Sequence, residues 1–458
     1  MRTPDDLDTR IRELVWKLVE TSPPPPPFPS TSPHGDESES GIATSFGGPL
    51  GRFRRGTSRG FVGAIVVTAL IVVVFFVPLP HVSLFKRLVR PTQLPTAAAP
   101  IPVGTQLAEL KGSDAVAGDE FGSSVAISAT TAVVGAPGFH NGAGRAYVFA
   151  KTTAGWKQVA ELKGSDTVAG DRFGESVAVS GHTVVVGAPG DAQQPRPAKN
   201  ASAYVFTETP VGWKQVARLT GSGTAAGDFG WSVAIAGNTA VVNAPVFAQW
   251  GQSGDAGTYI FAKAGGRWHQ VAKLKQVVKR CEACIENMTN YLVAISGTTV
   301  LVGTGSSALV STKTPAGWKQ TAEIEPSPDY GASSVGVSGT TAVVGQAGIT
   351  CGGSAYVFTK TLSGWRQVTE INRRMCRPLG YFGDPVAISG RTIVVGASLG
   401  VPDGRVYVFT KTVAGWKQAD VLKGSTGNFG FSVAVSGTTA IVGDGPAKGS
   451  GRAYVFEA

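Results

Sequence analysis

Four cysteines are the residues of this chain best able to form a covalent bond or to hold a metal ion. Cys281 and Cys284 form a single Cys-x-x-Cys pair, and Cys351 and Cys376 follow further along the sequence. Four thiolates can hold zinc in a tetrahedral site, whereas in an oxidising compartment the same residues pair as disulfides. The choice depends on which of these cysteines the fold brings together.

Other groups that could do chemistry are sparse. Five histidines are scattered along the chain, without a nucleophile paired to any of them and without the spacing of a two-histidine metal site. We therefore predict no catalytic residue, no metal and no cofactor. An acid or amide recurs before a Phe-Gly pair, at Asp119, Asp171, Asp228 and Asn428. Because it recurs with a repeat, we expect it to close a turn.

Basic and aromatic side chains gather in four segments, 191–200, 246–255, 276–290 and 372–381, that interrupt an otherwise regular pattern. The candidate binding residues in these segments are Arg196, Lys199, Phe247, Trp250, Lys279, Arg280, Arg373, Arg374 and Tyr381. Arginine and aromatic residues are the usual anchors of macromolecular interfaces. The segments are therefore either variable loops without a ligand or one binding surface.

The pattern that they interrupt is a repeat with a period of roughly 50 residues, and it must position every group named above. Each copy reads as four short strands that are rich in β-branched and aromatic residues and are bounded by Gly, Ser, Thr or Asp. The copies begin at Phe121, Phe173, Phe229, a degenerate copy near Thr289, Tyr330, Phe382 and Phe429. Residues 106–458 are therefore predicted to form an all-β, seven-bladed β-propeller.

The two ends of the array predict how the ring closes. The last copy stops at Ala453–Phe456 and lacks the outermost, Gly-Trp strand, while an isolated copy of that strand, Leu107–Gly112, precedes the first unit. We expect this N-terminal strand to complete the seventh blade, because the last sheet would otherwise keep an open edge.

The repeat also bears on the cysteines. Counting strands places all four at one end of the ring, but Cys281 and Cys284 enter the fourth unit while Cys376 enters the sixth. This separation disfavours a shared zinc site. We expect a disulfide between Cys351 and Cys376, with Cys281 and Cys284 as a second candidate pair.

One tryptophan recurs in each outermost strand, at Trp156, Trp213, Trp268, Trp318, Trp365 and Trp416. A single unit buries little of its apolar surface alone, so we expect these side chains to pack in a core between neighbouring blades. The alternative is that they are platforms on which sugars stack.

The Phe-Gly and Gly-Ala-Pro motifs, as in Phe121-Gly122 and Gly135-Ala136-Pro137, resemble those of the FG-GAP repeat family. That family includes the seven-bladed propeller of integrin α subunits and many bacterial cell-surface proteins. The resemblance covers 106–458; it weakens in the third unit, where Asn243 replaces the glycine, and in the fourth, which lacks Phe-Gly. It implies a binding propeller at a cell surface.

Calcium-binding members of this family place an Asp-rich loop between the first and second strands of some blades. Calcium needs six to eight oxygen ligands, usually several carboxylates. In this chain the seven corresponding connections are short and carry no acid, as in Gly181-His182-Thr183. They read as hairpin turns, and we predict no calcium there.

Upstream of the propeller, an uninterrupted apolar run, Phe61–Val77, is extended by Pro78-Leu79. As a helix, 61–79 roughly spans a ~30 Å hydrocarbon core. A cleaved signal peptide is the alternative, but sixty residues precede the run and no small-residue cleavage site follows closely. We predict a single-pass signal anchor. Residues 52–90 carry basic but no acidic side chains, which favours contact with lipid headgroups.

The flanking segments are predicted to be a tail and a stalk. Residues 1–60 form a cytoplasmic tail, in which 4–20 has the period of an amphipathic helix and a Pro-rich, disordered linker follows. This helix either lies marginally stable on the membrane or docks a cytoplasmic partner. Residues 80–105 form a Pro-rich stalk, and the propeller is then extracytoplasmic.

The net charge of +10 does not indicate nucleic-acid binding, because no basic stripe is interleaved with aromatic residues. The sequence instead predicts a membrane-anchored, extracytoplasmic binding or adhesion module that recognises a protein or glycan through the loop-rich face of its propeller. The alternative is a cell-envelope enzyme, a hydrolase or a quinoprotein-like dehydrogenase, that uses this face or the central channel.

Overall fold

A computed structural model describes a single compact part of the chain, which lies within Gln93–Ala458. The described residues are 101–190, 201–222, 228–245, 257–275, 292–304, 307–326, 332, 334–347, 353–372, 382–398, 404–424, 428–445 and 449–458. The tail 1–60, the predicted membrane segment 61–79 and all but the last residues of the stalk 80–105 lie outside them. Within the described ranges, no helix is both long and apolar enough to cross a bilayer.

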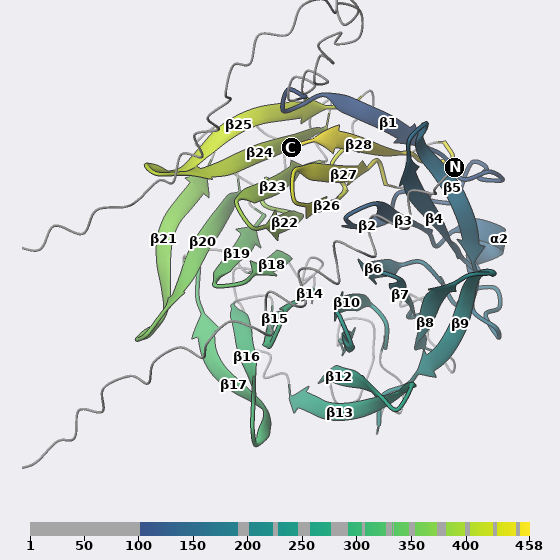
Figure 1. The fold of residues 1–458 in the computed structure, drawn as a ribbon, viewed down its shortest axis with the longest axis horizontal. Helices are drawn as coiled ribbons and strands as arrows, with labels where there is room; N and C mark the ends of the chain where they lie inside the picture. Colours follow the sequence, from purple (N-terminus) through teal and green to yellow (C-terminus); the bar gives the residue numbers. More distant parts are fainter. Residues whose placement is uncertain are drawn as a thin grey trace, which may run out of the picture. The chain divides into compact units, whose positions relative to one another are not determined.

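Seven antiparallel sheets of four strands each surround a central axis, which confirms the predicted seven-bladed propeller (Figure 1). The innermost strands are β2 (Ser124–Ser128), β6 (Ser176–Ser180), β10 (Ser232–Ala236), β14 (Val293–Ser296), β18 (Ser334–Ser338), β22 (Val386–Ser389) and β26 (Ser432–Ser436). The second strands are β3 (Thr131–Ala136), β7 (Thr183–Ala188), β11 (Thr239–Ala244), β15 (Thr299–Gly303), β19 (Thr341–Gln346), β23 (Thr392–Ala397) and β27 (Thr439–Gly443).

In six of the blades the outer half is a longer hairpin, whereas in the seventh it is the pair formed by the last strand of the chain and the first. The third strands are β4 (Arg145–Thr152), β8 (Ser202–Thr209), β12 (Gly257–Ala264), β16 (Ala308–Thr314), β20 (Ser354–Thr361), β24 (Arg405–Thr412) and β28 (Ala453–Glu457). The outermost strands are β5 (Gly155–Leu162), β9 (Gly212–Leu219), β13 (Arg267–Lys275), β17 (Gly317–Ile324), β21 (Gly364–Asn372), β25 (Gly415–Lys423) and β1 (Gln106–Leu110). We number the blades by their innermost strands, so that β2–β5 form blade 1 and β26, β27, β28 and β1 form blade 7.

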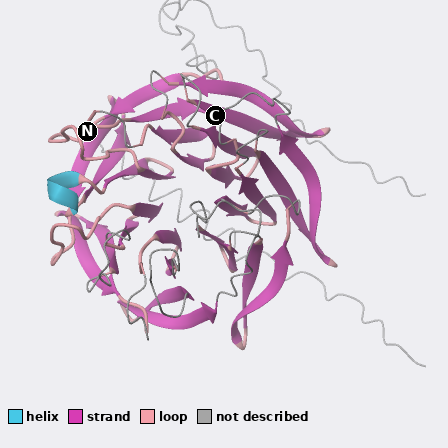
Figure 2. Ribbon diagram, turned by 180° about the vertical axis from the view of Figure 1, so that it is seen from behind, coloured by secondary structure: helices cyan, strands magenta, loops and turns pink. Residues whose placement is uncertain are grey.

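The ring closes as the sequence predicts. β1 pairs antiparallel with β28, with Ala108 opposite Val455 and Leu110 opposite Ala453. Figure 1 shows the first strand of the chain lying along the last, and Figure 2 shows the same ring from behind. The N-terminal strand therefore supplies the outermost strand of blade 7.

The two ends of the ring differ. The turns that join the first to the second strand and the third to the fourth strand of a blade lie at one end, which we call the hairpin end. The connections from the second to the third strand, and from each blade to the next, lie at the opposite end, the loop end. This division follows because successive strands of each blade run in opposite directions.

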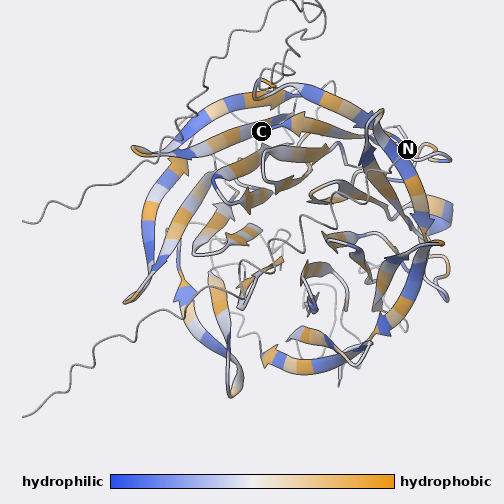
Figure 3. Ribbon diagram, viewed as in Figure 1, coloured by the Kyte–Doolittle hydropathy of each residue, from blue (hydrophilic) through white to orange (hydrophobic). Residues whose placement is uncertain are grey.

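The hydrophobic core lies between neighbouring blades, because each apolar cluster combines side chains of two adjacent sheets. The phenylalanine of each Phe-Gly pair is at its centre. The Phe121 ring is fully buried and lies 5.4 Å from the Tyr147 ring and 6.3 Å from the Phe149 ring, centroid to centroid. The outermost strands alternate polar and apolar residues, because only one of their faces meets this core (Figure 3).

The repeated tryptophans pack against these clusters, as a structural role requires, but they are less buried than expected. Trp156 and Trp213 are only half-buried at the margin of their clusters. Their strands are the outermost ones, so one face of each indole remains next to solvent. The fully buried aromatic residues are instead the phenylalanine of Phe-Gly and the tyrosine of the third strand.

Serine side chains at the last position of the innermost strands connect the blades at the hairpin end. Ser128 Oγ accepts a hydrogen bond of 3.1 Å from the backbone N–H of Gly181, the first turn residue of the next blade. The same bond recurs at Ser180–Gly237, Ser296–Gly339, Ser338–Gly390, Ser389–Gly437 and Ser436–Ala129. Blade 3 departs from this pattern, because Ala236 stands in the serine position.

A second set of serines connects the blades at the loop end. Ser124 Oγ donates a 2.7 Å hydrogen bond to the carbonyl oxygen of Gly174, the glycine of the next Phe-Gly pair. The bond recurs at Ser176–Gly230, Ser334–Gly383 and Ser432–Gly122. Each of these four innermost strands thus begins with a serine that bonds to the following blade.

The glycine of Gly-Ala-Pro faces the glycine of the next Phe-Gly pair. A Cβ atom on Gly135 would approach the Gly174 carbonyl oxygen to under 3.0 Å, closer than real Cβ contacts allow. Gly174 itself has φ +96°, in the left-handed region that glycine adopts without strain. The two halves of the FG-GAP motif that touch therefore come from neighbouring blades, and the motif describes the seam between them.

Candidate functional site

The residues predicted to bind a ligand all fall outside the described part of the chain. This applies to Arg196, Lys199, Phe247, Trp250, Lys279, Arg280, Arg373, Arg374 and Tyr381, and equally to Cys281, Cys284, Cys351 and Cys376. The described strands on either side show at which end of the ring these segments are attached. Ala188 ends β7 and Ser202 begins β8, both at the loop end, and the other interrupted segments likewise join strands at this end. Their binding role stays a prediction.

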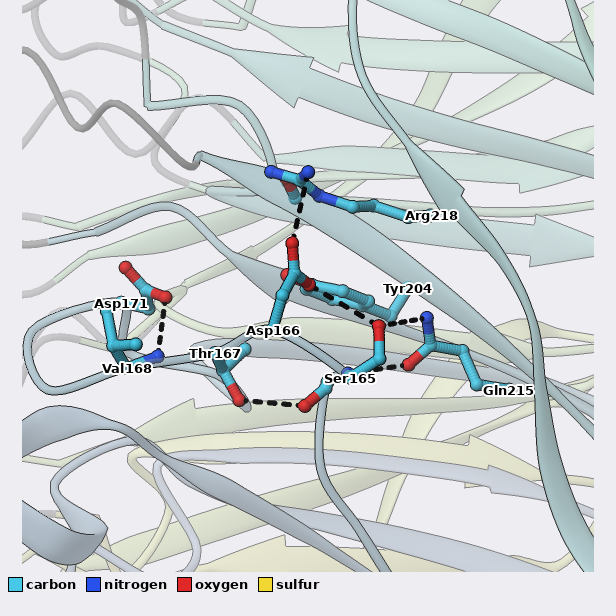
Figure 4. Close-up of polar contacts among 10 residues, drawn as sticks. Ser165, Asp166, Thr167, Val168, Asp171, Tyr204, Gln215 and Arg218 are labelled. Carbon is cyan, nitrogen blue, oxygen red and sulfur yellow. Dashed lines mark hydrogen bonds and ion pairs between the residues drawn. The ribbon is translucent and has the colours of Figure 1, made fainter.

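A network of polar side chains holds the loop that leads from blade 1 to blade 2 (Figure 4). Asp166 accepts a hydrogen bond of 2.9 Å from the Tyr204 hydroxyl and lies 3.1 Å from Nη1 of Arg218. The preceding residue, Ser165, donates its backbone N–H to Oε1 of Gln215 at 2.9 Å, and the Gln215 amide donates back to Ser165 Oγ. The loop is thereby fixed to the outer strands of the following blade.

This network recurs, so it belongs to the scaffold. One blade earlier, Asp114 accepts from Tyr147 at 2.7 Å and Ser113 pairs with Gln158 in the same two-bond manner. One blade later, Ser222 pairs with Gln270. Burial and the bond to Asp166 both raise the pKa of Tyr204 above its usual value, so its hydroxyl stays protonated and donates.

Two of the four repeated acid or amide residues, Asp119 and Asp171, close turns as predicted. Asp119 accepts a 2.7 Å hydrogen bond from the backbone N–H of Val116, and Asp171 accepts the equivalent bond from Val168 at 2.8 Å. Burial raises the pKa of Asp171, and this hydrogen bond partly opposes the increase. Both residues thus organise loops at the loop end.

Within the described ranges, one group of charged side chains occurs at a single boundary between blades. Arg172 lies between two carboxylates, with Nη2 at 2.9 Å from Glu120 of the preceding blade and Nε at 2.7 Å from Glu175. The three side chains are each between a fifth and a third exposed. Burial alone would lower the pKa of Arg172, but the two glutamates outweigh it and raise the pKa above its usual value. The guanidinium therefore stays charged.

Unusual backbone conformations converge on the same place. Among the described residues, five that are not glycine have a positive φ, and four of these are Glu120, Arg172, His140 and Asn141. His140 and Asn141 belong to α2 (Phe139–Gly142), a single turn that is not a regular right-handed helix. Such conformations cost about 1–3 kcal/mol each and cluster at functional sites.

Backbone hydrogen bonds join these segments. The Arg172 N–H donates to the Gly142 carbonyl at 2.7 Å, and the Gly138 N–H donates to the Asp119 carbonyl at 3.1 Å. The loop that carries His140 is thus held between the two loops that carry Glu120 and Arg172. We call Glu120, His140, Asn141, Arg172 and Glu175 the blade 1–2 cluster.

The cluster can bind polar groups. His140 and Asn141 are exposed, and the Glu120 carboxylate has oxygen lone pairs beyond the one that accepts from Arg172. Hydroxyl, amide and ammonium groups are suitable donors to them. No group of three or more metal-ligating side chains occurs within the described ranges. Sequence reasoning missed the cluster, although an acid and a base occupy the same repeat position at Glu120 and Arg172.

Comparison with known proteins agrees with the repeat pattern. The model of the FG-GAP repeat family matches residues 105–149, 156–206, 213–261, 378–409 and 424–456. No curated protein matches the sequence significantly.

Among solved structures, a Pseudomonas aeruginosa periplasmic gluconolactonase is similar, with a TM-score of 0.48 and 13% identity over 68% of this chain and 95% of that one. A Lactobacillus plantarum protein is similar with a TM-score of 0.45 and 13% identity, over 66% of this chain and 84% of that one. The sequence motifs, the family match and the sheet topology together lead to one conclusion. The chain carries FG-GAP repeats, and these repeats form a seven-bladed β-propeller.

Proposed function

We propose that this protein is a membrane-anchored binding module whose propeller recognises a protein or glycan through its loop end. The observation that carries the proposal is the blade 1–2 cluster. Four residues with strained backbones and one charged triad meet there, on connections that the surrounding blades hold in place. The ring that holds these connections is closed by the pairing of β1 with β28.

The chemistry of the cluster favours a polar ligand. Glu120 offers a carboxylate acceptor that Arg172 holds in place, and exposed His140 and Asn141 add groups that both donate and accept. Sugar hydroxyls and peptide N–H groups have matching donors. The predicted basic and aromatic residues, such as Trp250, Arg373 and Arg374, would extend this surface around the loop end.

Binding arrays of glycans and of proteins, probed with the full-length protein in lipid nanodiscs, test the proposal. We expect a specific ligand whose binding falls at least tenfold in the variants Arg172→Ala and His140→Ala. A matched control is Arg391→Ala, which removes an exposed arginine at the hairpin end. Equal loss in the control, or binding that no loop-end variant affects, would show that the loop end is not the binding surface.

The enzyme alternative is separated by assaying the same preparation for hydrolase and dehydrogenase turnover. The binding proposal expects no turnover above background. Robust turnover that Arg172→Ala or Trp250→Ala abolishes would replace the binding proposal with an enzymatic one.

The membrane topology is part of the proposal. The apolar run 61–79, preceded by a sixty-residue segment, supports an uncleaved anchor with the propeller on the extracytoplasmic side. Protease treatment of intact cells should reach the propeller without lysis. A propeller that is cut only after lysis would reverse this topology.

A further inference from the structure

The six outer hairpins carry charge of almost a single sign at the hairpin end. Each joins a third to an outermost strand and follows the pattern Lys-Thr-x-x-Gly-Trp-Lys or a close variant, and all six lie within the described residues. Their basic residues are Lys151, Lys157, Lys214, Lys263, Arg267, Lys313, Lys319, Lys360, Arg366, Lys411 and Lys417. The acid among them, Glu208, pairs with His182 at 2.7 Å.

Apolar side chains project from the tips of three of these hairpins. Val211 is 78% exposed, and Leu362 and Val413 are fully exposed. All three occupy the two turn positions before Gly-Trp, where no core contact is available. Leu362 and Val413 belong to neighbouring blades 5 and 6, so the two tips are adjacent along the rim.

The loop end has the opposite character near blades 1 and 2. Its connections there, 111–123 and 163–175, carry six acids against the three basic residues Lys111, Lys163 and Arg172; the acids are Asp114, Asp119, Glu120, Asp166, Asp171 and Glu175. The basic residues of the hairpin end are therefore segregated from these acids along the axis of the ring. A surface that combines segregated positive charge with protruding apolar side chains matches the interface of an anionic bilayer.

The chain also enters the ring at the hairpin end. Gly104 N donates to the Glu457 carbonyl at 2.7 Å and Glu457 N donates to the Thr105 carbonyl at 2.9 Å, next to the first turn of blade 7, where Ala458 N bonds to Thr438 O. Residues 61–79 lie upstream of this point. At about 3.5 Å per extended residue, 80–105 could reach at most about 90 Å, which is enough to connect a membrane segment to this end of the ring.

We propose that the hairpin end of the propeller docks onto the anionic phospholipid headgroups of the membrane that anchors the chain. The lysines and arginines of the six outer hairpins contact the phosphates, and the tips at Val211, Leu362 and Val413 enter the headgroup layer. The seventh blade has no such hairpin, and its third strand ends in the acidic residue Glu457. The ring therefore tilts so that blade 7 lies further from the bilayer than the other six blades. The loop end then faces away from the bilayer. This inference rests on the proposed membrane anchor, but not on which ligand the loop end binds.

Hydrogen–deuterium exchange on the full-length protein in nanodiscs tests the docking. One nanodisc contains 30 mol% phosphatidylglycerol and the other phosphatidylcholine alone, so no variant is needed for the first comparison. Amides in 151–157, 208–214, 360–366 and 411–417 should exchange at least threefold more slowly in the anionic nanodisc. Salt at 0.5 M should remove the difference, because it screens headgroup contacts. Equal exchange in both nanodiscs would overturn the proposal.

A pair of charge reversals locates the surface. Each basic residue near an anionic membrane contributes about fivefold in binding, so Lys360→Glu with Lys411→Glu should abolish the lipid-dependent protection. The matched control reverses two exposed lysines at the loop end, Lys163→Glu with Lys423→Glu, which changes the net charge equally. Thermal melts check that both variants fold. If the control removes the protection as completely, net charge and not the hairpin end is responsible, and the docking proposal fails.

Discussion

The seam between blades 1 and 2 and the seam between blades 3 and 4 use the same fold with different contacts. In the first, Gly135 faces Gly174, and Ser128 bonds to the next turn. In the second, Asn243 replaces the glycine, Ala236 replaces the serine, and the following blade has no Phe-Gly pair. Asn243 and the missing Phe-Gly pair occur together because, in a regular seam, the two glycines of these positions meet in one contact. The seam, and not the single blade, is the unit that the motif describes.

The irregular seam has its own polar contacts. Asn243 is buried, and its Oδ1 accepts a 2.9 Å hydrogen bond from the Thr258 hydroxyl. Ser232 Oγ, which would donate to a Phe-Gly carbonyl in a regular seam, instead accepts from Val293 N at 3.1 Å. The boundary between two blades can therefore lose the FG-GAP motif and still have its buried polar groups hydrogen-bonded, provided that the residues of both blades change.

The largest expected effect concerns the aromatic core of a regular seam. Phe173→Ala should lower the free energy of unfolding by about 3–5 kcal/mol, because the ring is fully buried against Tyr204 and Phe206. Trp318→Ala, at the half-buried margin of the irregular seam, should cost about 2 kcal/mol. Urea denaturation monitored by circular dichroism measures both. A larger cost at Trp318 would mean that the tryptophans, and not the Phe-Gly rings, dominate the core.

A second test exchanges the seam residues themselves. Gly187→Ala should cost about 3 kcal/mol, because the added Cβ meets the Gly230 carbonyl oxygen. The reverse change in blade 3, Asn243→Gly, should also destabilise, by about 1–2 kcal/mol, because it removes the partner of Thr258. Melting temperatures of the two variants give the comparison. A stabilised Asn243→Gly protein would show that blade 3 is merely a defective copy.

Tyrosine hydroxyls provide a third contrast. Tyr204→Phe should cost about 1.5 kcal/mol, because it removes a hydrogen bond to the charged Asp166. The equivalent Tyr259 hydroxyl has no hydrogen-bond partner within the described residues, and the sequence has Gly223 where Asp166 stands one blade earlier. Tyr259→Phe should therefore change stability by less than about 0.5 kcal/mol. Similar losses in the two variants, measured by guanidinium unfolding, would remove this distinction.

The serine hydrogen bonds at the hairpin end predict smaller changes in stability, a loss where a serine is removed and a gain where one is added. Ser180→Ala should cost about 1 kcal/mol, because Gly237 N loses its acceptor. Ala236→Ser should add the bond that the blade 3–4 seam lacks and gain about 0.5 kcal/mol. Differential scanning calorimetry resolves shifts of this size in a pairwise comparison. Destabilisation by Ala236→Ser would indicate that the irregular seam has a different spacing.

The smallest effect depends on pH. Burial raises the pKa of Asp171 in the folded protein above its unfolded value, so the ionised form is disfavoured by folding. Its destabilising contribution is absent at low pH and grows as pH rises through the folded pKa. Asp171→Asn keeps the acceptor for Val168 N and should give a slight gain at pH 7 that disappears in acid. Blade 7 already has Asn428 in this position. Melting curves from pH 3 to pH 8 provide the measurement; a loss at pH 7 would contradict the sign.

The number of blades and the strand that closes the ring were predictable because both depend on local patterns. Alternating apolar residues define each strand, and the isolated copy at Leu107–Gly112 marks the closing one. The depth to which the tryptophans are buried was harder to predict. Tryptophan is the largest apolar residue of the repeat, but its strand lies outermost, so one face of the side chain stays next to solvent. The blade 1–2 cluster depends on a contact across 52 positions between Glu120 and Arg172. The repeat places these two positions on neighbouring blades, but the direction of their side chains, which decides whether they meet, depends on the backbone conformation at each site.

Closure by β1 has a consequence for biosynthesis. The first strand of the propeller to leave the ribosome pairs with the last, about 350 residues later in the chain. At about 5–20 residues per second, translation leaves β1 without its partner for roughly 20–70 s. During that interval blades 1 to 6 can assemble in order of synthesis, but the ring stays open. Nascent chains that stall before β28 would therefore expose both the edge of β1 and an incomplete seventh blade to chaperones and proteases.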